Sequence, residues 1–273
     1  MLDDYVVSSL ITTYGKCGCF DESRRVFADI DETTVIHLNA TLSTLVNADC
    51  HADSVDLFQN MVGLKLEVDC NTFSIVPKAC SAMTDLEHGR NIHSLALKSG
   101  FHQDCYVETA VIDLYCQCGN IVNAEMTFSY LSNLAAWNAM ITGYAQHGCY
   151  NEAFELYDRM IVCRIEPDEI TYLGLLTSCS YAGLLQEAQS YMNSMVEYHS
   201  LTPHLEHCAC MVDLLGRVGL LEDAKSTIDE MPIEPDALIW QILLSACCLH
   251  GNFDTGRVAA GKLLELQPGN KSA

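Results

Sequence analysis

The sequence predicts an all-α fold made of stacked helix–turn–helix units, and three features lead to this prediction. Apolar residues recur at helical spacing, glycines separate the helical segments, and one 35-residue unit recurs in register. A single helical hairpin of this size cannot bury both of its apolar faces, so it needs neighbours of its own kind. The predicted architecture is therefore an α-solenoid in which each unit packs on the next.

The segment 134–168, LAAWNAMITGYAQHGCYNEAFELYDRMIVCRIEPD, shows the unit most clearly. A first helix is predicted up to Gln146, because Gly148 takes a left-handed conformation without strain and so ends the helix. Asn151 is predicted to cap the second helix. Asp168 is placed to cap the first helix of the next unit.

The unit recurs over nearly the whole chain. Its predicted division is an array of seven repeats over 4–236, namely 4–34, 35–69, 70–104, 105–133, 134–168, 169–204 and 205–236, followed by a repeat-like unit at 237–270 and a tail at 271–273. Segment 105–133 is two residues shorter than 4–34, which is enough to disturb the register of Thr109.

The repeated motifs resemble pentatricopeptide repeats of the plant kind, in which standard, long and short variants alternate. WNAMITGYAQHG resembles the standard variant, NTFSIVPKACSAMTDLEHGRNIHSLALKSGF the long one, and LITTYGKCG and VIDLYCQCG the short one. Segment 237–270 resembles the extension motif that follows the last short repeat. The resemblance covers residues 4 to 270. It implies a right-handed superhelix of such repeats that binds single-stranded RNA in a mitochondrion or chloroplast.

The resemblance also implies which residues select RNA bases, namely the fifth and the last residue of each repeat. The implied pairs are Asn39 with Asp69, Ser74 with Asp104, Thr109 with Asn133, and Asn138 with Asp168. In that order they resemble pairs that prefer uracil, guanine, adenine and uracil, so the expected target is 5′-U-G-A-U-3′. The alternative for the repeat-end residues is a plain N-cap. It does not account for asparagine at a fifth position, because asparagine is a mediocre helix former.

The charge balance favours a different function. Lys plus Arg is 14 and Asp plus Glu is 36, so the net charge is −22. A protein that grips a phosphate backbone usually has a basic surface, because counterion release drives the binding. An acidic helical scaffold for a basic protein partner is therefore the alternative hypothesis. The position of the Lys and Arg side chains discriminates between the two, since the first helices are expected to line the groove that holds RNA.

Three groups of residues could be mistaken for active sites. His204 and Glu206 form an H-x-E string like that of zinc deaminases, but the completing P-C-x-x-C is missing. Cys247 and His250 lack an orienting third group, so packing is the better interpretation. The paired acids that open two predicted second helices suit the helix dipole; they are Asp21, Glu22, Glu222 and Asp223. No catalytic residue, metal site or cofactor is predicted.

The remaining features concern location and partners. The 15 cysteines fall within helical segments and are interpreted as reduced packing residues in a reducing compartment. No apolar run is long enough to span a bilayer, and no transit peptide precedes the first repeat. Both ends are abrupt, which suggests a fragment of a longer protein. The resemblance implies site recognition for cytidine-to-uridine RNA editing, with a deaminase recruited in trans through the C-terminal extension motif.

Overall fold

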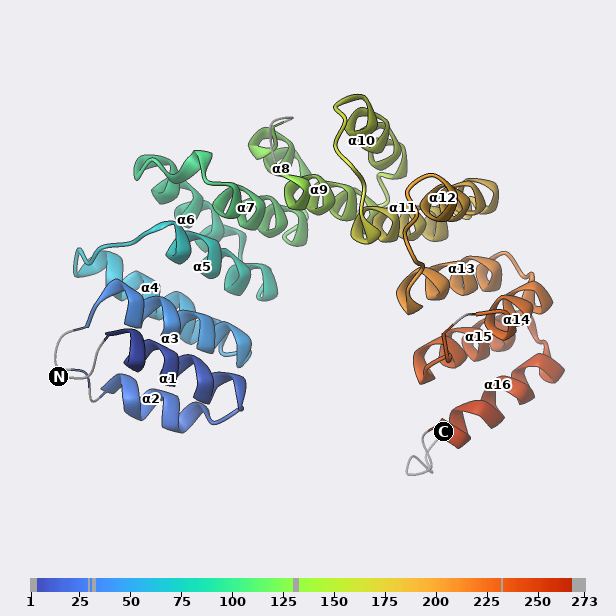
Figure 1. The fold of residues 1–273 in the computed structure, drawn as a ribbon, viewed down its shortest axis with the longest axis horizontal. Helices are drawn as coiled ribbons and strands as arrows, with labels where there is room; N and C mark the ends of the chain where they lie inside the picture. The colour runs from blue at the N-terminus through green and yellow to red at the C-terminus, as the bar shows by residue number, and fades with distance from the viewer. Residues whose placement is uncertain (1–3, 29, 31–32, 130–132, 232, 267–273) are drawn as a thin grey trace. The chain divides into compact units, whose positions relative to one another are not determined.

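The computed structural model describes residues 4–28, 30, 33–129, 133–231 and 233–266, and these residues form helices without a strand. The first helices of successive pairs are α1 (Asp4–Lys16), α3 (Val35–Asn47), α5 (Cys70–Ala82), α7 (Cys105–Gln117), α9 (Leu134–Gln146), α11 (Glu169–Ala182), α13 (Leu205–Arg217) and α15 (Ala237–His250). The second helices are α2 (Phe20–Ala28), α4 (His51–Gly63), α6 (Leu86–Lys98), α8 (Ile121–Thr127), α10 (Tyr150–Val162), α12 (Leu185–Glu197), α14 (Leu221–Asp229) and α16 (Phe253–Leu266) (Figure 1). A short 3-10 turn, η1 (Phe101–Gln103), precedes α7. The predicted all-α class is confirmed.

The chain divides into two compact units, Met1–Met140 and Ile141–Ala273, and the boundary between them falls within the sequence of α9. In the first unit, α1, α3, α5 and α7 pack on one another in that order, and each carries its own second helix. In the second unit, α11, α13 and α15 repeat the arrangement with α12, α14 and α16. Each helical hairpin thus buries its apolar face against a neighbour of the same kind, as the repeats predict.

Unequal repeat lengths are absorbed by the second helices. Every first helix has 13 or 14 residues, whereas α8 has only 7 and α2 and α14 have 9. Helix α7 keeps its full 13 residues, and Thr109 is its fifth residue. The disturbance of Thr109 that the short segment 105–133 led us to expect is therefore absent, because the missing residues come from α8.

The turn between α9 and α10 corrects one prediction. Gly148 has the expected left-handed conformation, with φ of 71°. However, the N-cap of α10 is Cys149, and Asn151 lies inside the helix. The reason is a tight reversal: the N–H of Gly148 donates to Ala145 and the N–H of Cys149 donates to Tyr144, at 3.2 and 2.9 Å. The chain therefore turns in fewer residues than a cap at Asn151 requires.

The core of the first unit runs along the stacked first helices. Ile11, Leu42 and Phe73 are fully buried on α1, α3 and α5. The helices approach closely at Gly15, where an added β-carbon would lie 2.6 Å from Thr44 Cγ2. A larger residue at Gly15 would push α1 away from α3. This close contact limits how far α1 can lie from α3.

Candidate nucleic-acid interface

The first predicted pair, Asn39 and Asp69, is joined by a hydrogen bond. Asn39 is the fifth residue of α3, and Asp69 immediately precedes α5. The Asn39 Nδ2 donates to Asp69 Oδ1 at 2.9 Å. The two residues are 30 positions apart in the chain, and the packing of α3 on α5 brings them together.

Asp69 is also the N-cap of α5. Its Oδ1 accepts from the Thr72 N–H at 2.9 Å, and its Oδ2 accepts from the Asn71 side-chain amide at 3.2 Å. Burial alone would raise the pKa of Asp69, but the hydrogen bonds from Thr72, Asn39 and Asn71 outweigh it and hold that pKa below its usual value. Asp69 is therefore an anion at neutral pH, and the cap and the predicted pair share one carboxylate.

The third predicted pair, Thr109 and Asn133, is also in contact. The Thr109 hydroxyl lies 3.2 Å from Asn133 Oδ1 but only 2.7 Å from the Cys105 carbonyl oxygen. Asn133 Oδ1 accepts from the Ala136 N–H at 2.9 Å and so caps α9. A hydroxyl has one hydrogen, and here two acceptors compete for it.

The second predicted pair, Ser74 and Asp104, is not joined by a hydrogen bond that the structure records. The Ser74 hydroxyl donates to the Asn71 carbonyl at 2.9 Å. Asp104 Oδ1 accepts from the N–H groups of Tyr106 and Val107 at 3.0 and 3.1 Å, so it caps α7. The fourth pair is Asn138 with Asp168, and its members belong to different compact units.

The two members of the fourth pair are therefore described separately. Asn138 is only 4% exposed, in contrast to the half-buried Asn39. Asp168 caps α11, because its Oδ1 accepts from the N–H of Thr171 at 2.9 Å and from its hydroxyl at 3.0 Å. The cap interpretation thus holds for Asp69, Asp104, Asn133 and Asp168 alike.

A row of exposed apolar side chains was missed by the sequence reasoning. The second residues of α1, α3 and α7 are Tyr5, Ile36 and Tyr106, which are 76%, 52% and 72% exposed. A residue three positions later lies on the same helix face, so each is adjacent to the fifth residue of its helix. The sequence signal was available, as an apolar residue outside the buried stripe. In the second unit, Ile170 and Leu238 occupy the same place on α11 and α15 and are also exposed.

Charge is sparse on the first helices. Helices α3, α9 and α15 contain no Asp, Glu, Lys or Arg. The basic residues of the other first helices are Lys16, Lys78 and Arg217, and the acidic ones are Asp4, Glu108, Asp113, Glu169, Glu206 and Asp213. Arg217 is paired with Asp213 at 2.7 Å. The first helices are thus neither basic nor uniformly acidic, and most of the acidic residues lie on the second helices and the connections.

The surroundings of the H-x-E string are structural hydrogen bonds. His207 is buried, its Nδ1 accepts from the His204 N–H at 3.1 Å, and its Nε2 lies 2.8 Å from the Glu169 carbonyl oxygen. These bonds connect α13 to the start of α11. Among the described residues, no three His, Cys, Asp or Glu side chains are grouped so that they could hold a metal ion.

The most deeply buried cysteines are not activated nucleophiles. None of the 15 cysteines forms a disulfide, and burial raises the pKa of Cys80, Cys116 and Cys179 to about 12. A thiol with such a pKa stays protonated at neutral pH and is a poor nucleophile. Cys247 is buried in the core formed by α13–α16, as its position beside Leu243 predicts.

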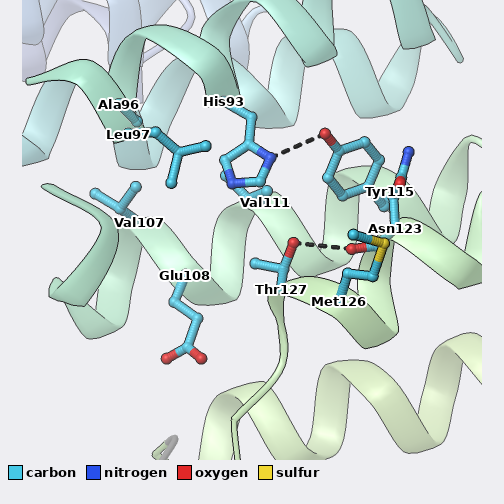
Figure 2. A pocket seen from close by; sticks show the side chains of 10 residues that line it. All are labelled: His93, Ala96, Leu97, Val107, Glu108, Val111, Tyr115, Asn123, Met126 and Thr127. Atoms are coloured by element: carbon cyan, nitrogen blue, oxygen red, sulfur yellow. Dashed lines mark hydrogen bonds between the residues drawn. The ribbon is translucent and has the colours of Figure 1, made fainter.

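A hollow of about 400 Å³ lies among α6, α7 and α8 and is lined by side chains of all three (Figure 2). His93 and Tyr115 face each other within it, with Nδ1 and the hydroxyl oxygen 2.9 Å apart. Burial lowers the pKa of His93 and raises that of Tyr115, so both stay uncharged at neutral pH. The pair is a neutral hydrogen bond and not an activated acid and base.

Comparison with known proteins agrees with this repeated geometry. The PPR repeat family matches residues 132–181, and the PPR repeat matches residues 5–32, 109–132, 170–199 and 207–234. The pentatricopeptide repeat-containing protein At1g50270 of Arabidopsis thaliana is 34% identical over 97% of this chain and 45% of its own length. The chain belongs to the PPR repeat family.

Other Arabidopsis relatives of this PPR chain show the same partial coverage. The pentatricopeptide repeat-containing protein At4g20770 is 36% identical over 99% of the chain and 36% of its own length. The mitochondrial protein At1g06140 is 33% identical over 98% of the chain and 49% of its own length. The PPR chain thus spans less than half the length of these curated relatives. No helix in the described ranges is long and apolar enough to cross a membrane.

Solved structures show the same fold. The crystal structure of the pentatricopeptide repeat protein PPR10 in complex with an 18-nt psaJ RNA element matches 97% of this PPR chain and 40% of that chain, with a TM-score of 0.78 and 18% identity. The crystal structure of PPR10 from maize matches with a TM-score of 0.72. These matches confirm the α-solenoid class of the chain.

Proposed function

We propose that this PPR chain binds single-stranded RNA and selects bases through the fifth and last residues of its repeats. The hydrogen bond of 2.9 Å between Asn39 and Asp69 carries the proposal. The bond holds the half-buried Asn39 side chain between α3 and the start of α5, two stretches of helix without a charged residue. Asp69 needs no such partner to act as the N-cap of α5. The chain acts by binding, since the buried thiol of Cys80 stays protonated and the His207 ring is engaged in a structural hydrogen bond.

The Asn39 amide can read one edge of a base. An amide has two N–H donors and an oxygen with two lone pairs. One N–H goes to Asp69, so one donor and at least one acceptor site remain, which suits the mixed edge of uracil. Ile36, three positions earlier on α3, presents an exposed apolar surface to the face of the same base. Tyr106 is placed in the same way beside Thr109 and can stack on a base through its ring.

The alternation of repeat variants leads to a more detailed proposal. We propose that 4–236 is an array of seven repeats of alternating kind and that 237–270 is an extension motif. The RNA sequence that the array binds is then 5′-U-G-A-U-3′. The G is the weakest position, since Ser74 donates to the Asn71 carbonyl and Asp104 caps α7, with no recorded bond between the two. Recognition of a site for cytidine-to-uridine editing in a mitochondrial or chloroplast transcript, with a deaminase recruited in trans, is the role that fits a base-reading chain without catalytic groups.

The test is a binding titration with a single-stranded RNA that contains UGAU and with variants that change one base at a time. Wild type should bind the UGAU oligomer best. Asn39→Thr should move the preference at the first position from uracil toward guanine. Asn60→Thr is the matched control, because Asn60 is exposed on the second helix α4 and should leave every preference unchanged. Equal binding of all oligomers by wild type would refute base reading.

A second function, an acidic scaffold for a basic protein, is favoured by the net charge of −22. Most of that charge lies off the first helices, so it does not argue directly against RNA at α3 or α9. The same titration separates the two functions. A scaffold would bind RNA with no base preference, and it would bind a lysine-rich protein with an affinity that falls steeply as salt is added.

A further inference from the structure

Thr72 takes part in the contact between Asn39 and Asp69, although it belongs to neither of the predicted positions. It is the third residue of α5 and is 0% exposed. Its hydroxyl oxygen lies 2.7 Å from Asn39 Oδ1, 3.0 Å from Asp69 Oδ1 and 3.2 Å from the Asp69 backbone nitrogen. The hydroxyl therefore touches both members of the pair.

The number of hydrogens decides which of these contacts the hydroxyl donates to. The Asp69 N–H can only donate, so the Thr72 oxygen accepts from it. The single hydroxyl hydrogen then has two acceptors in reach. Asp69 Oδ1 already accepts from Asn39 and from the Thr72 N–H, whereas Asn39 Oδ1 is closer. Donation to Asn39 Oδ1 gives each of these atoms a partner.

This arrangement fixes which way the Asn39 amide faces. Its nitrogen must face the carboxylate and its oxygen the hydroxyl. A flipped amide would set its oxygen against the ionised Asp69, whose pKa lies below the usual value. Such a flip would also lose the bond from Thr72. The order of donor and acceptor that Asn39 presents to a ligand is therefore set by two groups, the Asp69 carboxylate at its nitrogen and the Thr72 hydroxyl at its oxygen.

The order of donor and acceptor matters because uracil and cytosine carry opposite orders on the edge that pairs. Uracil offers an acceptor at O4 beside a donor at N3, whereas cytosine offers a donor at N4 beside an acceptor at N3. An amide with a fixed orientation matches one of them, and an amide free to flip matches either.

We propose that Thr72 is a positioning residue that makes Asn39 choose uracil over cytosine. The inference rests on the proposed function, because it presupposes that Asn39 meets a base. It adds a third residue to the site, contributed by the first helix of the following repeat. Thr72 itself is buried and does not touch the RNA.

The distribution of such residues along the chain supports this role. Threonine follows both asparagine positions, since Thr171 stands at the third place of α11 and bonds Asp168 as Thr72 bonds Asp69. The repeats whose fifth residue is Ser74 or Thr109 are followed by Val107 and Ala136 at that place. A hydroxyl at the fifth position rotates freely and has no amide to orient, so it needs no such partner.

The experiment measures binding to two single-stranded RNAs that differ only by uracil or cytosine at the first base of UGAU. Thr72→Val keeps the shape of the side chain and removes the hydroxyl. We expect it to lower the uracil-over-cytosine ratio about fivefold, the factor that one ordinary hydrogen bond is worth. Thr72→Ser restores the hydroxyl and should restore the ratio.

Two further variants make the result specific. Thr41→Val removes another buried hydroxyl of the same helix stack, one that donates to the His37 carbonyl at 2.9 Å. It should lower the thermal midpoint as Thr72→Val does but leave the base ratio unchanged. In the background of Asn39→Ala, Thr72→Val should have no further effect on the ratio, because the amide it orients is gone.

The outcomes separate the inference from the proposed function. If wild type prefers uracil, Asn39→Ala abolishes the preference and Thr72→Val retains it, the positioning role is overturned while base reading stands. If wild type has no preference between the two RNAs, base reading at Asn39 fails, and the positioning role fails with it.

Discussion

The junctions α3–α5 and α7–α9 place the same two repeat positions in contact, yet the contacts differ in strength. At α3–α5 the acceptor is the carboxylate of Asp69, which receives hydrogen bonds from Asn39, Asn71 and Thr72. At α7–α9 the acceptor is the neutral amide oxygen of Asn133, and Thr109 can divert its hydrogen to its own helix. Equivalent positions in the sequence therefore do not give equivalent bonds.

The difference comes from charge and from competition. Hydrogen bonds to an ionised acceptor are shorter and about twice as strong as neutral ones. The Asn39 bond is 2.9 Å and the Thr109 bond 3.2 Å, in that order of strength. The hydroxyl of a threonine in a helix can also donate to the carbonyl oxygen of the residue four positions earlier, as Thr109 does to Cys105. The Asn39 amide instead donates to Asp69. The α3–α5 junction should accordingly be the stiffer and more selective of the two.

The largest expected effect is on stability. Asp69→Ala removes an N-cap and leaves the Asn39 amide N–H and the Thr72 backbone N–H without their acceptor, so we expect a loss of about 2 kcal/mol in the free energy of unfolding. Asn133→Ala removes a neutral cap and should cost about 1 kcal/mol. Urea titrations measure both, with Asp56→Ala, an exposed acid on α4, as the control. Equal losses at the two caps would contradict the comparison.

The second prediction uses pH, because only one of the two acceptors titrates. The pKa of Asp69 is lower in the folded chain than in the unfolded chain, so its stabilisation is complete above the unfolded value of about 3.9 and is lost as the pH falls through the folded value. The gap in urea midpoint between wild type and Asp69→Asn should therefore be constant at neutral pH and narrow below about pH 4.

Asn133→Ala provides the matched control for this titration. The amide of Asn133 has no proton to gain, so the gap between wild type and Asn133→Ala should stay constant over the same pH series. A parallel narrowing for both variants would show that other carboxylates cause the change.

A smaller effect is expected at Thr109. Thr109→Val removes a hydroxyl that is held mainly by its own helix, so the free energy of unfolding should fall by about 0.5 kcal/mol or less. The preference for adenine at the third base should disappear, and Thr109→Ser should retain it. The titration with single-base variants measures this. A loss of uracil preference at the first base in Thr109→Val would show that the two junctions are coupled.

The smallest effect concerns charge beside the two junctions. Helix α3 has no charged residue, whereas Glu108 immediately precedes Thr109 on α7. Glu108→Gln should raise RNA affinity about twofold at low salt, the size expected of one partly solvated charge. Glu125→Gln on the second helix α8 is the control. The gain at Glu108 should vanish in high salt, because added ions screen it.

The sequence predicted the helices well because the signals for them are local. Apolar spacing, the glycine at Gly148 and the acids before first helices each act within a few residues. The cap at Asn151 was wrong because two backbone hydrogen bonds shortened the turn. The expected disturbance of Thr109 by the short segment 105–133 was not found. The sequence did not show that the two missing residues come from α8, which leaves Thr109 as the fifth residue of α7.

The candidate site was harder to predict, because its bonds join residues far apart in the chain. The pairing of Asn39 with Asp69 came from the family resemblance and not from a local signal. Ser74 and Asp104 carry the same resemblance and show no recorded bond to each other, since Ser74 donates to the Asn71 carbonyl and Asp104 caps α7. The exposed Tyr106 and the buried Thr72 were not singled out, although both positions recur in the repeat.

The sequence by itself determined the helical class, the spacing of the repeats and which residues stand at equivalent places, because these depend on periodicity and on local backbone preferences. The tertiary structure alone decided which equivalent residues bond to one another. A hydrogen bond across 30 residues depends on how closely two first helices pack and on which other groups compete for the same hydrogen. The packing of α3 on α5 brings Asn39, Asp69 and Thr72 into one network, and no single helix contains all three.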